Sequence, residues 1–233
     1  MKHVFAILFI LFTTQCTLNA QSFFPIQLTV LGFPNQEIYI AQISGDHYRI
    51  TDTLLSDSQG IFECSFDASY SVGMYVFLFP QFQNTEIDFI FNKEAVSFKT
   101  NIGNIHSNLQ IVSSVENTLL YSFRTHYVNF LNDIALLEQI YDSYSDDAFK
   151  KNTHAEYTKK IKHDEEFVSL LLKNHHHTFA AQLIKSSRIP HSPQLVSAQE
   201  RHEYAKQNFL HAVNFADTLL CNSTVFTEKA IKY

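Results

Sequence analysis

The sequence predicts an α+β protein in which a β-rich part is followed by an all-helical part. Two observations lead to this prediction: apolar residues alternate with a period of two up to about residue 110, and recur with a period of three to four after residue 112. A hydrophobic fraction of 45% is enough for a substantial core and argues against a disordered chain. We therefore expect an antiparallel β-sandwich-like domain over 21–110 and a helical domain with a long helical hairpin over 111–233.

The β-rich part contains about seven short strands, separated by turns in which Gly, Pro, Asn and Ser recur. One of these strands, Gly73–Phe79, is apolar on both faces and is predicted to be central in its sheet. The chain has 22 Phe, 11 Tyr and no Trp, so we expect a phenylalanine-rich core. The predicted strands are Ile26–Leu31, Glu37–Ile43, Tyr48–Leu55, Ile61–Phe66, Gly73–Phe79, Ile87–Phe91 and Val96–Phe98.

A capping box, Ser113-Ser114-Val115-Glu116, is predicted to open the first helix, with a serine hydroxyl on the N3 amide and the glutamate reaching back. Large apolar residues then recur from Leu120 to Tyr144 at spacings of three and four, and such a seam needs a partner helix. Phe149–Lys173 supplies a candidate return helix. Glu116 is expected to matter only as a cap.

Three shorter helices are predicted towards the end of the chain. Thr178–Ser186 forms one, and a second capping box over Ser197–Glu200 starts another that continues to about Val213. A last helical run covers Val225–Tyr233. Because the chain finishes inside this run, we expect the helical domain to be incomplete at its C-terminus.

The first twenty residues have the layout of a secretory signal peptide. Lys2 precedes the apolar run Val4–Phe12, which is too short to cross a bilayer, and Ala20 suits the position before a cleavage site. We expect residues 1–20 to be removed and the protein to be exported to the periplasm or cell envelope, with no membrane span. Acylation of Cys16 as a lipoprotein is the less favoured alternative, since Thr13-Thr14-Gln15 fits that processing poorly.

The composition argues against two kinds of partner, and it leaves three possible roles for Cys64. The net charge of -6 and the lack of a basic cluster argue against binding to nucleic acid or to anionic membrane surfaces. Cys64 alternates with Phe62 and Phe66 and is predicted to be a buried thiol. A disulfide between Cys64 and Cys221 is an alternative, and redox catalysis is a third.

The residue patterns that could indicate a catalytic or metal-binding site are better explained as helix ends, helix caps and solvated charges. His175-His176-His177 is expected at a helix end, where histidines meet terminal carbonyls, with a metal site as the alternative. His163 and Glu166 have the spacing of a di-iron motif but lack a second Glu-x-x-His. No Gly-x-Ser-x-Gly elbow and no Gly-rich phosphate loop occur.

The acidic residues also have structural explanations. Asp217 is expected to cap a helix, and the acidic pairs at 146–147 and 165–166 are expected to be solvated. We therefore predict no catalytic, cofactor-binding or metal-binding residue, and no cofactor.

Several blocks of the sequence occur in an order and at spacings shared with one protein family. The blocks are Thr51-Asp52-Thr53 with Gly60-Ile61-Phe62, Phe89–Glu94 with Val96-Ser97-Phe98, Ser113–Asn117 with Leu120-Tyr121, and Phe209 with Val213–Asp217 and Leu219-Leu220. Together they resemble the N-terminal region of exported bacteroidete-type thiol-disulfide oxidoreductase-like proteins. In that family a small β domain and a helical domain precede a thioredoxin-like domain that carries a Cys-x-x-Cys motif. This chain has no Cys-x-x-Cys, so no catalytic residue of the family has a counterpart here.

The resemblance implies an exported, non-catalytic accessory region that positions a substrate or partner for a thioredoxin-like domain. The alternative is a stand-alone cell-envelope protein that binds a peptide, a glycan or another small ligand. The expected partners are accordingly a thioredoxin-like domain or an envelope protein.

Overall fold

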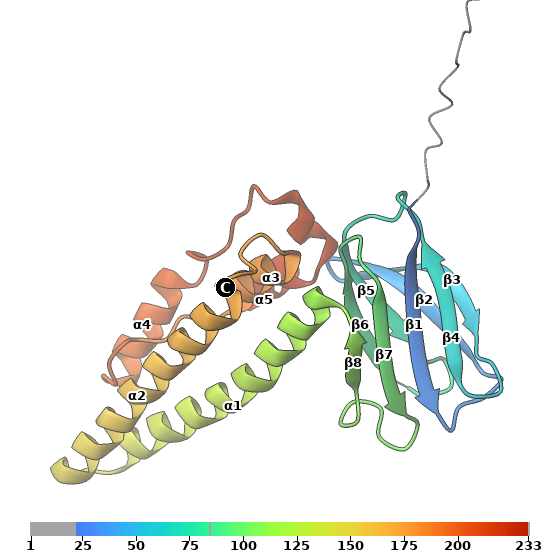
Figure 1. Ribbon diagram of the computed structural model, residues 1–233. Helices are drawn as coiled ribbons and strands as arrows, with labels where there is room; N and C mark the ends of the chain where they lie inside the picture. The colour runs from blue at the N-terminus through green and yellow to red at the C-terminus, as the bar shows by residue number, and fades with distance from the viewer. Residues whose placement is uncertain (1–21, 84, 233) are drawn as a thin grey trace, which may run out of the picture.

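The computed structural model describes residues 22–83 and 85–232, and within them the chain is α+β, as predicted (Figure 1). The predicted signal peptide, with Cys16, and the final Tyr233 lie outside the described residues. The strands are β1 Phe24–Leu31, β2 Glu37–Ser44, β3 His47–Leu55, β4 Ile61–Phe66, β5 Gly73–Leu78, β6 Glu86–Phe91, β7 Val96–Asn101 and β8 Gln110–Ser113. The helices are α1 Val115–Ser143, α2 Asp147–Leu172, α3 Phe179–Ser187, α4 Ala198–Asn208, the 3-10 helix η1 Thr218–Asn222 and α5 Val225–Lys232.

The strands form two four-stranded sheets with the orders β4-β1-β7-β8 and β3-β2-β5-β6. Neighbouring strands are antiparallel in five of the six pairs, but β1 and β7 are parallel, with Leu28 opposite Phe98. Turn signals report only how successive strands connect, so this pairing of strands far apart in the chain could not be predicted. The short strand β8 was also missed, because its four residues are mostly exposed and show no apolar alternation.

Phenylalanine is the most frequent residue in the core between the two sheets, as expected. The ring of Phe66 contacts the rings of Phe89 and Phe91, and all three side chains are fully buried. Each buried side chain of this size contributes about 1.5–3 kcal/mol through removal of apolar surface from water. The sandwich therefore has its own hydrophobic core.

The second sheet is covered on its outer face as well. In β5, Tyr75 and Phe77 point into the sandwich, whereas Met74 and Val76 belong to a second cluster with Phe123 and the helices α3, η1 and α5. Figure 1 shows the start of α1 and the pair α3 and α5 beside this sheet. The prediction that this strand is central and buried on both faces is confirmed.

The predicted helical hairpin is formed by α1 and α2, which pack along much of their length (Figure 1). Phe130 and Ile134 of the apolar seam meet Tyr157 and Ile161 of the return helix. The buried hydroxyl of Tyr157 donates to the carbonyl of Ser192, 3.0 Å away, so the hairpin is also joined to the segment before α4.

The capping box predicted for the first helix is wrong by one residue. Ser113 belongs to β8, and Ser114 is the N-cap, whose hydroxyl accepts from the amide of Asn117 at 3.0 Å. The carboxylate that meets the first amides of α1 comes from Glu94, in the turn between β6 and β7, which accepts from the amide of Glu116 at 3.0 Å. Ser114 has a positive φ of 152°, a conformation rarely adopted by side-chain-bearing residues, and this bend between strand and helix displaced the predicted start.

Glu116 is a buried side chain rather than a solvated cap. It is 3% exposed, and its carboxylate accepts from the amides of Phe179 and Ala180 at 3.1 and 2.6 Å and from the side chain of Asn92. Glu116 thus caps α3, a helix more than sixty residues later in the chain. The negative charge lies at the positive end of that helix dipole.

The other predicted caps are confirmed. Ser197 and Glu200 form a complete capping box on α4, and Asp217 caps η1 through the amide of Leu219. Asp146, which was expected only as a solvated charge in a turn, is exposed and in addition caps α2 by accepting from the amide of Phe149. Helix α4 ends at Asn208, five residues before the predicted end, and none of its residues is buried. Among the residues described, no helix has the length and hydrophobicity needed to cross a membrane.

We predict that Glu116→Ala destabilises the protein by roughly 3–5 kcal/mol, because it leaves two amides and an amide side chain unpaired in the interior. The control is Glu200→Ala, which removes the exposed glutamate of a capping box and should cost about 1 kcal/mol. Urea unfolding of the two variants measures the difference. Equal losses in both variants would show that burial of Glu116 contributes no more than a surface cap.

Candidate functional site

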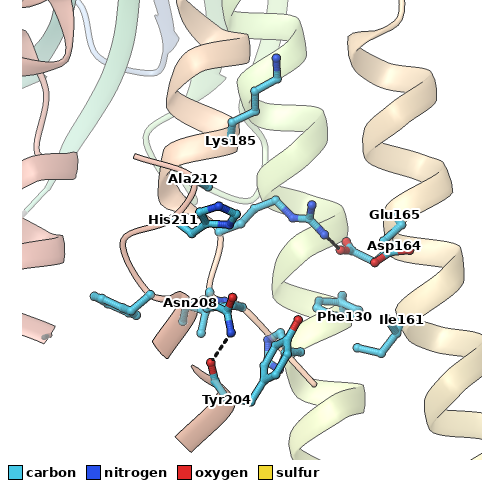
Figure 2. A pocket seen from close by; sticks show the side chains of 14 residues that line it. Phe130, Ile161, Asp164, Glu165, Lys185, Tyr204, Asn208, His211 and Ala212 are labelled. Atoms are coloured by element: carbon cyan, nitrogen blue, oxygen red, sulfur yellow. Dashed lines mark hydrogen bonds and ion pairs between the residues drawn. The ribbon is translucent and has the colours of Figure 1, made fainter. Parts of the chain in front are cut away.

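A cavity of about 290 Å³ lies beside the helical hairpin, between α1, α2, the end of α3 and the segment that includes α4 (Figure 2). Apolar and polar side chains both line it, as in small-molecule sites. The lining residues are Phe130, Ile161, Asp164, Glu165, Lys185, Arg188, Ile189, Pro190, His191, Tyr204, Asn208, Phe209, His211 and Ala212.

The polar wall of this cavity is built on Asp164 of α2. Its carboxylate is 1% exposed; one oxygen lies 3.0 Å from Nε2 of His126, and the other accepts from Nη2 of Arg188. A buried carboxylate needs such partners, since its desolvation is otherwise costly. These two contacts compensate the buried charge of Asp164 and hold the guanidinium of Arg188 at one edge of the cavity.

Arg188 keeps donor capacity after this pairing. Its side chain is 31% exposed, and in the described part of the chain neither Nε, which is buried, nor Nη1 forms a hydrogen bond. The ion pair with Asp164 uses Nη2. Arg188 can therefore donate from Nη1 to a group in the cavity while it remains anchored to α2.

His191 supplies a neutral polar group on the same wall. Burial lowers the pKa of this imidazole to about 4; the negative charge of Asp164 opposes the shift and the positive charge of Arg188 adds to it. The ring meets Phe130 edge to face at 5.3 Å, and its buried Nε2 has no hydrogen-bond partner within the described residues. At neutral pH the imidazole is uncharged.

The backbone of this wall is fixed from behind by α5. The ammonium of Lys229, which is 4% exposed, donates to the carbonyls of Arg188 and Phe209 at 2.8 and 3.2 Å and lies over the Phe209 ring. Burial lowers the pKa of Lys229, with a further contribution from Lys232, while Glu228 opposes it. The final helix is thus packed against the site through a buried side chain.

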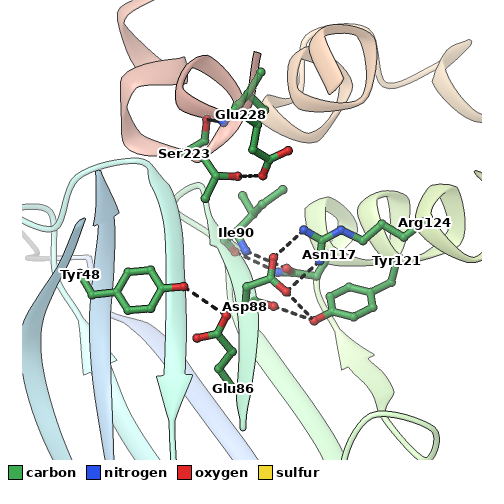
Figure 3. A network of polar contacts seen from close by, with 11 residues as sticks. Tyr48, Glu86, Asp88, Ile90, Asn117, Tyr121, Arg124, Ser223 and Glu228 are labelled. Atoms are coloured by element: carbon green, nitrogen blue, oxygen red, sulfur yellow. Dashed lines mark hydrogen bonds and ion pairs between the residues drawn. The ribbon is translucent and has the colours of Figure 1, made fainter. Parts of the chain in front are cut away.

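A second polar network lies at the junction of β6 and α1 (Figure 3). The side-chain amide of Asn117 accepts from the amide of Ile90 at 2.7 Å and donates to the carbonyl of the same residue at 2.9 Å. Arg124 donates twice to Asp88, and Tyr121 donates to the Asp88 carbonyl. Burial acts to raise the pKa of Asp88, but Arg124 and the hydrogen bonds outweigh it and leave the pKa lowered. The network pairs the backbone of Ile90 and the carbonyl of Asp88 along the edge strand β6.

Cys64 and Cys221, the two cysteines among the described residues, are free thiols, which contradicts a disulfide between them. Cys221 is exposed. Cys64 was predicted to be buried, but it is half-buried, because β4 is the edge strand of its sheet. Burial and the nearby Asp52 raise the pKa of the Cys64 thiol to about 12.

The histidine patterns do not assemble a metal centre. His175–His177 lie in the turn after α2, where the amide of His175 donates to the carbonyl of Leu172, as the helix-end interpretation predicted. His163 and Glu166 are exposed on α2 among lysines. Over residues 22–83 and 85–232, no group of three or more His, Cys, Asp or Glu side chains could hold a metal ion.

Sequence reasoning missed Asp164, Arg188 and His191. A signal for Asp164 was present, because it lies at helical spacing between Ile161 and Val168 on the buried side of α2. A charged residue on such a stripe requires a buried partner. The partner, Arg188, comes from beyond α3, and no local pattern connects the two.

Comparisons with known proteins assign no family to this fold and cavity. No family model matches the chain, and no curated protein matches it. Among solved structures, a 5-hydroxyisourate hydrolase from Klebsiella pneumoniae aligns over 39% of this chain and 98% of its own, with 14% identity and a TM-score of 0.26. This likeness is too low to support an argument about fold or function.

We predict that the purified chain is inert in an insulin-reduction turbidity assay. With a pKa near 12 for Cys64, only about one thiol in ten thousand is a thiolate at pH 8, and the thiolate is the attacking species. Cys64→Ser and Cys221→Ser should give the same baseline. Activity that disappears in Cys64→Ser would contradict the prediction.

We also predict that His191 makes the protein less stable as the pH falls from about 6.5 to about 4. In that range the unfolded chain binds a proton that the folded chain does not, so the free energy of unfolding decreases, by roughly 2–3 kcal/mol at pH 4. Urea unfolding at pH 7 and pH 4 should show a smaller loss in His191→Gln than in the wild type. The exposed control His176→Gln should behave as wild type; identical losses in all three proteins would refute the assignment.

Proposed function

We propose that this chain is an exported, non-catalytic region that holds a small ligand and positions it for a thioredoxin-like domain, the role that the family resemblance implies. The cavity beside the hairpin is the observation that supports ligand binding. It combines an apolar surface from Phe130, Ile161 and Ile189 with the guanidinium of Arg188 and the neutral imidazole of His191. Pockets that bind small molecules have this composition.

The construction of the wall also supports a binding role. Asp164 anchors Arg188 from α2, and Lys229 anchors the Arg188 carbonyl from α5. A polar group that is held on two sides is pre-organised, so little conformational entropy is lost when a ligand binds. Export, with removal of residues 1–20, is part of the proposal and derives from the N-terminal sequence.

The alternative is a stand-alone cell-envelope protein that binds a peptide, a glycan or another small ligand in the same cavity. In the first function the ligand is positioned for a thioredoxin-like domain, whereas in the second the chain binds its ligand without such a domain. The DNA that follows the gene separates them: an adjoining frame that encodes a Cys-x-x-Cys domain supports the positioning role, whereas an unrelated gene supports the stand-alone protein.

We predict that a substitution that fills the cavity abolishes ligand binding without unfolding the protein. Ala212 lines the cavity and is exposed, so Ala212→Phe places a phenyl ring there without disturbing the core. The matched control is Ala155→Phe at an exposed position of α2. The assay is a thermal-shift screen of short peptides, disaccharides and small organic acids.

At least one compound should raise the melting temperature of the wild type and of Ala155→Phe but leave Ala212→Phe unchanged. Binding raises the melting temperature because the ligand binds the folded state alone. A screen in which no compound distinguishes Ala212→Phe from its control would refute ligand binding in this cavity.

A further inference from the structure

We propose that the cavity recognises a small organic carboxylate with a compact apolar body, with the carboxylate on Arg188 and the body against Phe130, Ile161 and Ile189. This inference rests on the proposed function and specifies the chemical class of its ligand. It follows from which polar groups of the cavity are already paired and which remain available.

The carboxylates of the cavity are poor partners for a cationic ligand. Asp164 is 1% exposed, and its two oxygens are engaged by His126 and Arg188. Glu165 is exposed and so is Lys185, which also lines the cavity, so the rim carries one negative and one positive charge. The inner wall therefore presents no vacant acceptor charge.

The donors of the same wall are available. Nη1 of Arg188 forms no hydrogen bond within the described residues, and the guanidinium stays charged at every relevant pH. Hydrogen bonds from a charged donor to a carboxylate are stronger than those to a neutral oxygen by about 1 kcal/mol or more. Arg188 therefore favours an anionic oxygen over an amide oxygen of the same shape.

The size and the apolar lining restrict the rest of the ligand. A cavity of about 290 Å³ is near the lower limit for small-molecule pockets. Phe130 is 6% exposed and Ile161 8% exposed, so both present limited, fixed apolar surfaces rather than mobile side chains. A single ring or a short branched chain fits such a space better than a peptide or a disaccharide.

The test uses three probes of one shape and different charge: benzoate, benzamide and benzamidine. Binding to the full chain is measured by ligand-observed NMR, which reports weak affinities. Benzoate should bind roughly tenfold more tightly than benzamide, and benzamidine should bind least. Added salt should weaken the binding of benzoate and leave that of benzamide unchanged.

Variants connect the preference to Arg188. Arg188→Gln should weaken benzoate binding roughly tenfold, while Asp164→Asn, which removes the neutralising charge, should strengthen it. The double variant Asp164→Asn with Arg188→Gln replaces the ion pair by an amide pair, so it leaves no buried charge that could unfold the protein, and it should also lose the preference for benzoate. Lys151→Gln, at an exposed site of α2 away from the cavity, is the control for charge and should leave binding unchanged.

The outcomes separate this inference from the proposed function. Equal affinity for benzoate and benzamide, tightest binding of benzamidine, or benzoate binding unaffected by the double variant would overturn the carboxylate assignment. If none of the three probes binds, but another compound still distinguishes Ala212→Phe from Ala155→Phe, the ligand class is wrong and the binding function stands. If no compound of any kind does so, both fail.

Discussion

The burial of two adjacent polar side chains at the start of α1, Glu116 and Asn117, is the interaction on which the rest of the structure depends. Asn117 satisfies the amide and the carbonyl of Ile90 at the edge of β6, and Glu116 satisfies the first amides of α3. One turn of one helix thus fixes the sheet on one side and the short helix on the other. Both side chains are almost fully enclosed, so their hydrogen bonds have no competing water, and loss of either partner leaves buried groups unpaired.

This junction gives the two parts of the chain a shared interior. The outer face of the β3-β2-β5-β6 sheet, with Met74, Val76 and Ile90, packs with Phe123 of α1 and with α3, η1 and α5 in one hydrophobic cluster. The Asp88–Arg124 pair lies at the margin of the same interface. Apolar burial supplies the non-directional part of the stability, and the polar contacts set how α1 leaves the sheet. The direction of α1 in turn determines where the hairpin and its cavity are held (Figure 1).

The cavity depends on a second buried polar side chain, Asp164, which lies in the helical part. Asp164 on the buried stripe of α2 can be accommodated only with cationic or hydrogen-bonding partners, and Arg188 and His126 supply them. Arg188 reaches Asp164 from the end of α3, and the segment that follows it contacts α1 through Ile189 and His191 and forms one wall of the cavity. Figure 2 shows the lining side chains of this cavity. The requirement to pair one buried charge thus shapes the wall that we propose to bind a ligand.

The sequence by itself determined the α+β class, the change from strands to helices, the central position of β5, the hairpin and the caps at Ser197 and Asp217. Each of these features depends on local periodicity or on side-chain hydrogen bonds within a few residues. Only the tertiary structure decided the parallel pairing of β1 with β7, the burial of Glu116 and the cavity around Arg188. Each of these joins residues that are distant in the chain. Glu116 illustrates the reason: a glutamate in a first helical turn has the same local pattern whether water or the N-terminus of another helix receives its carboxylate.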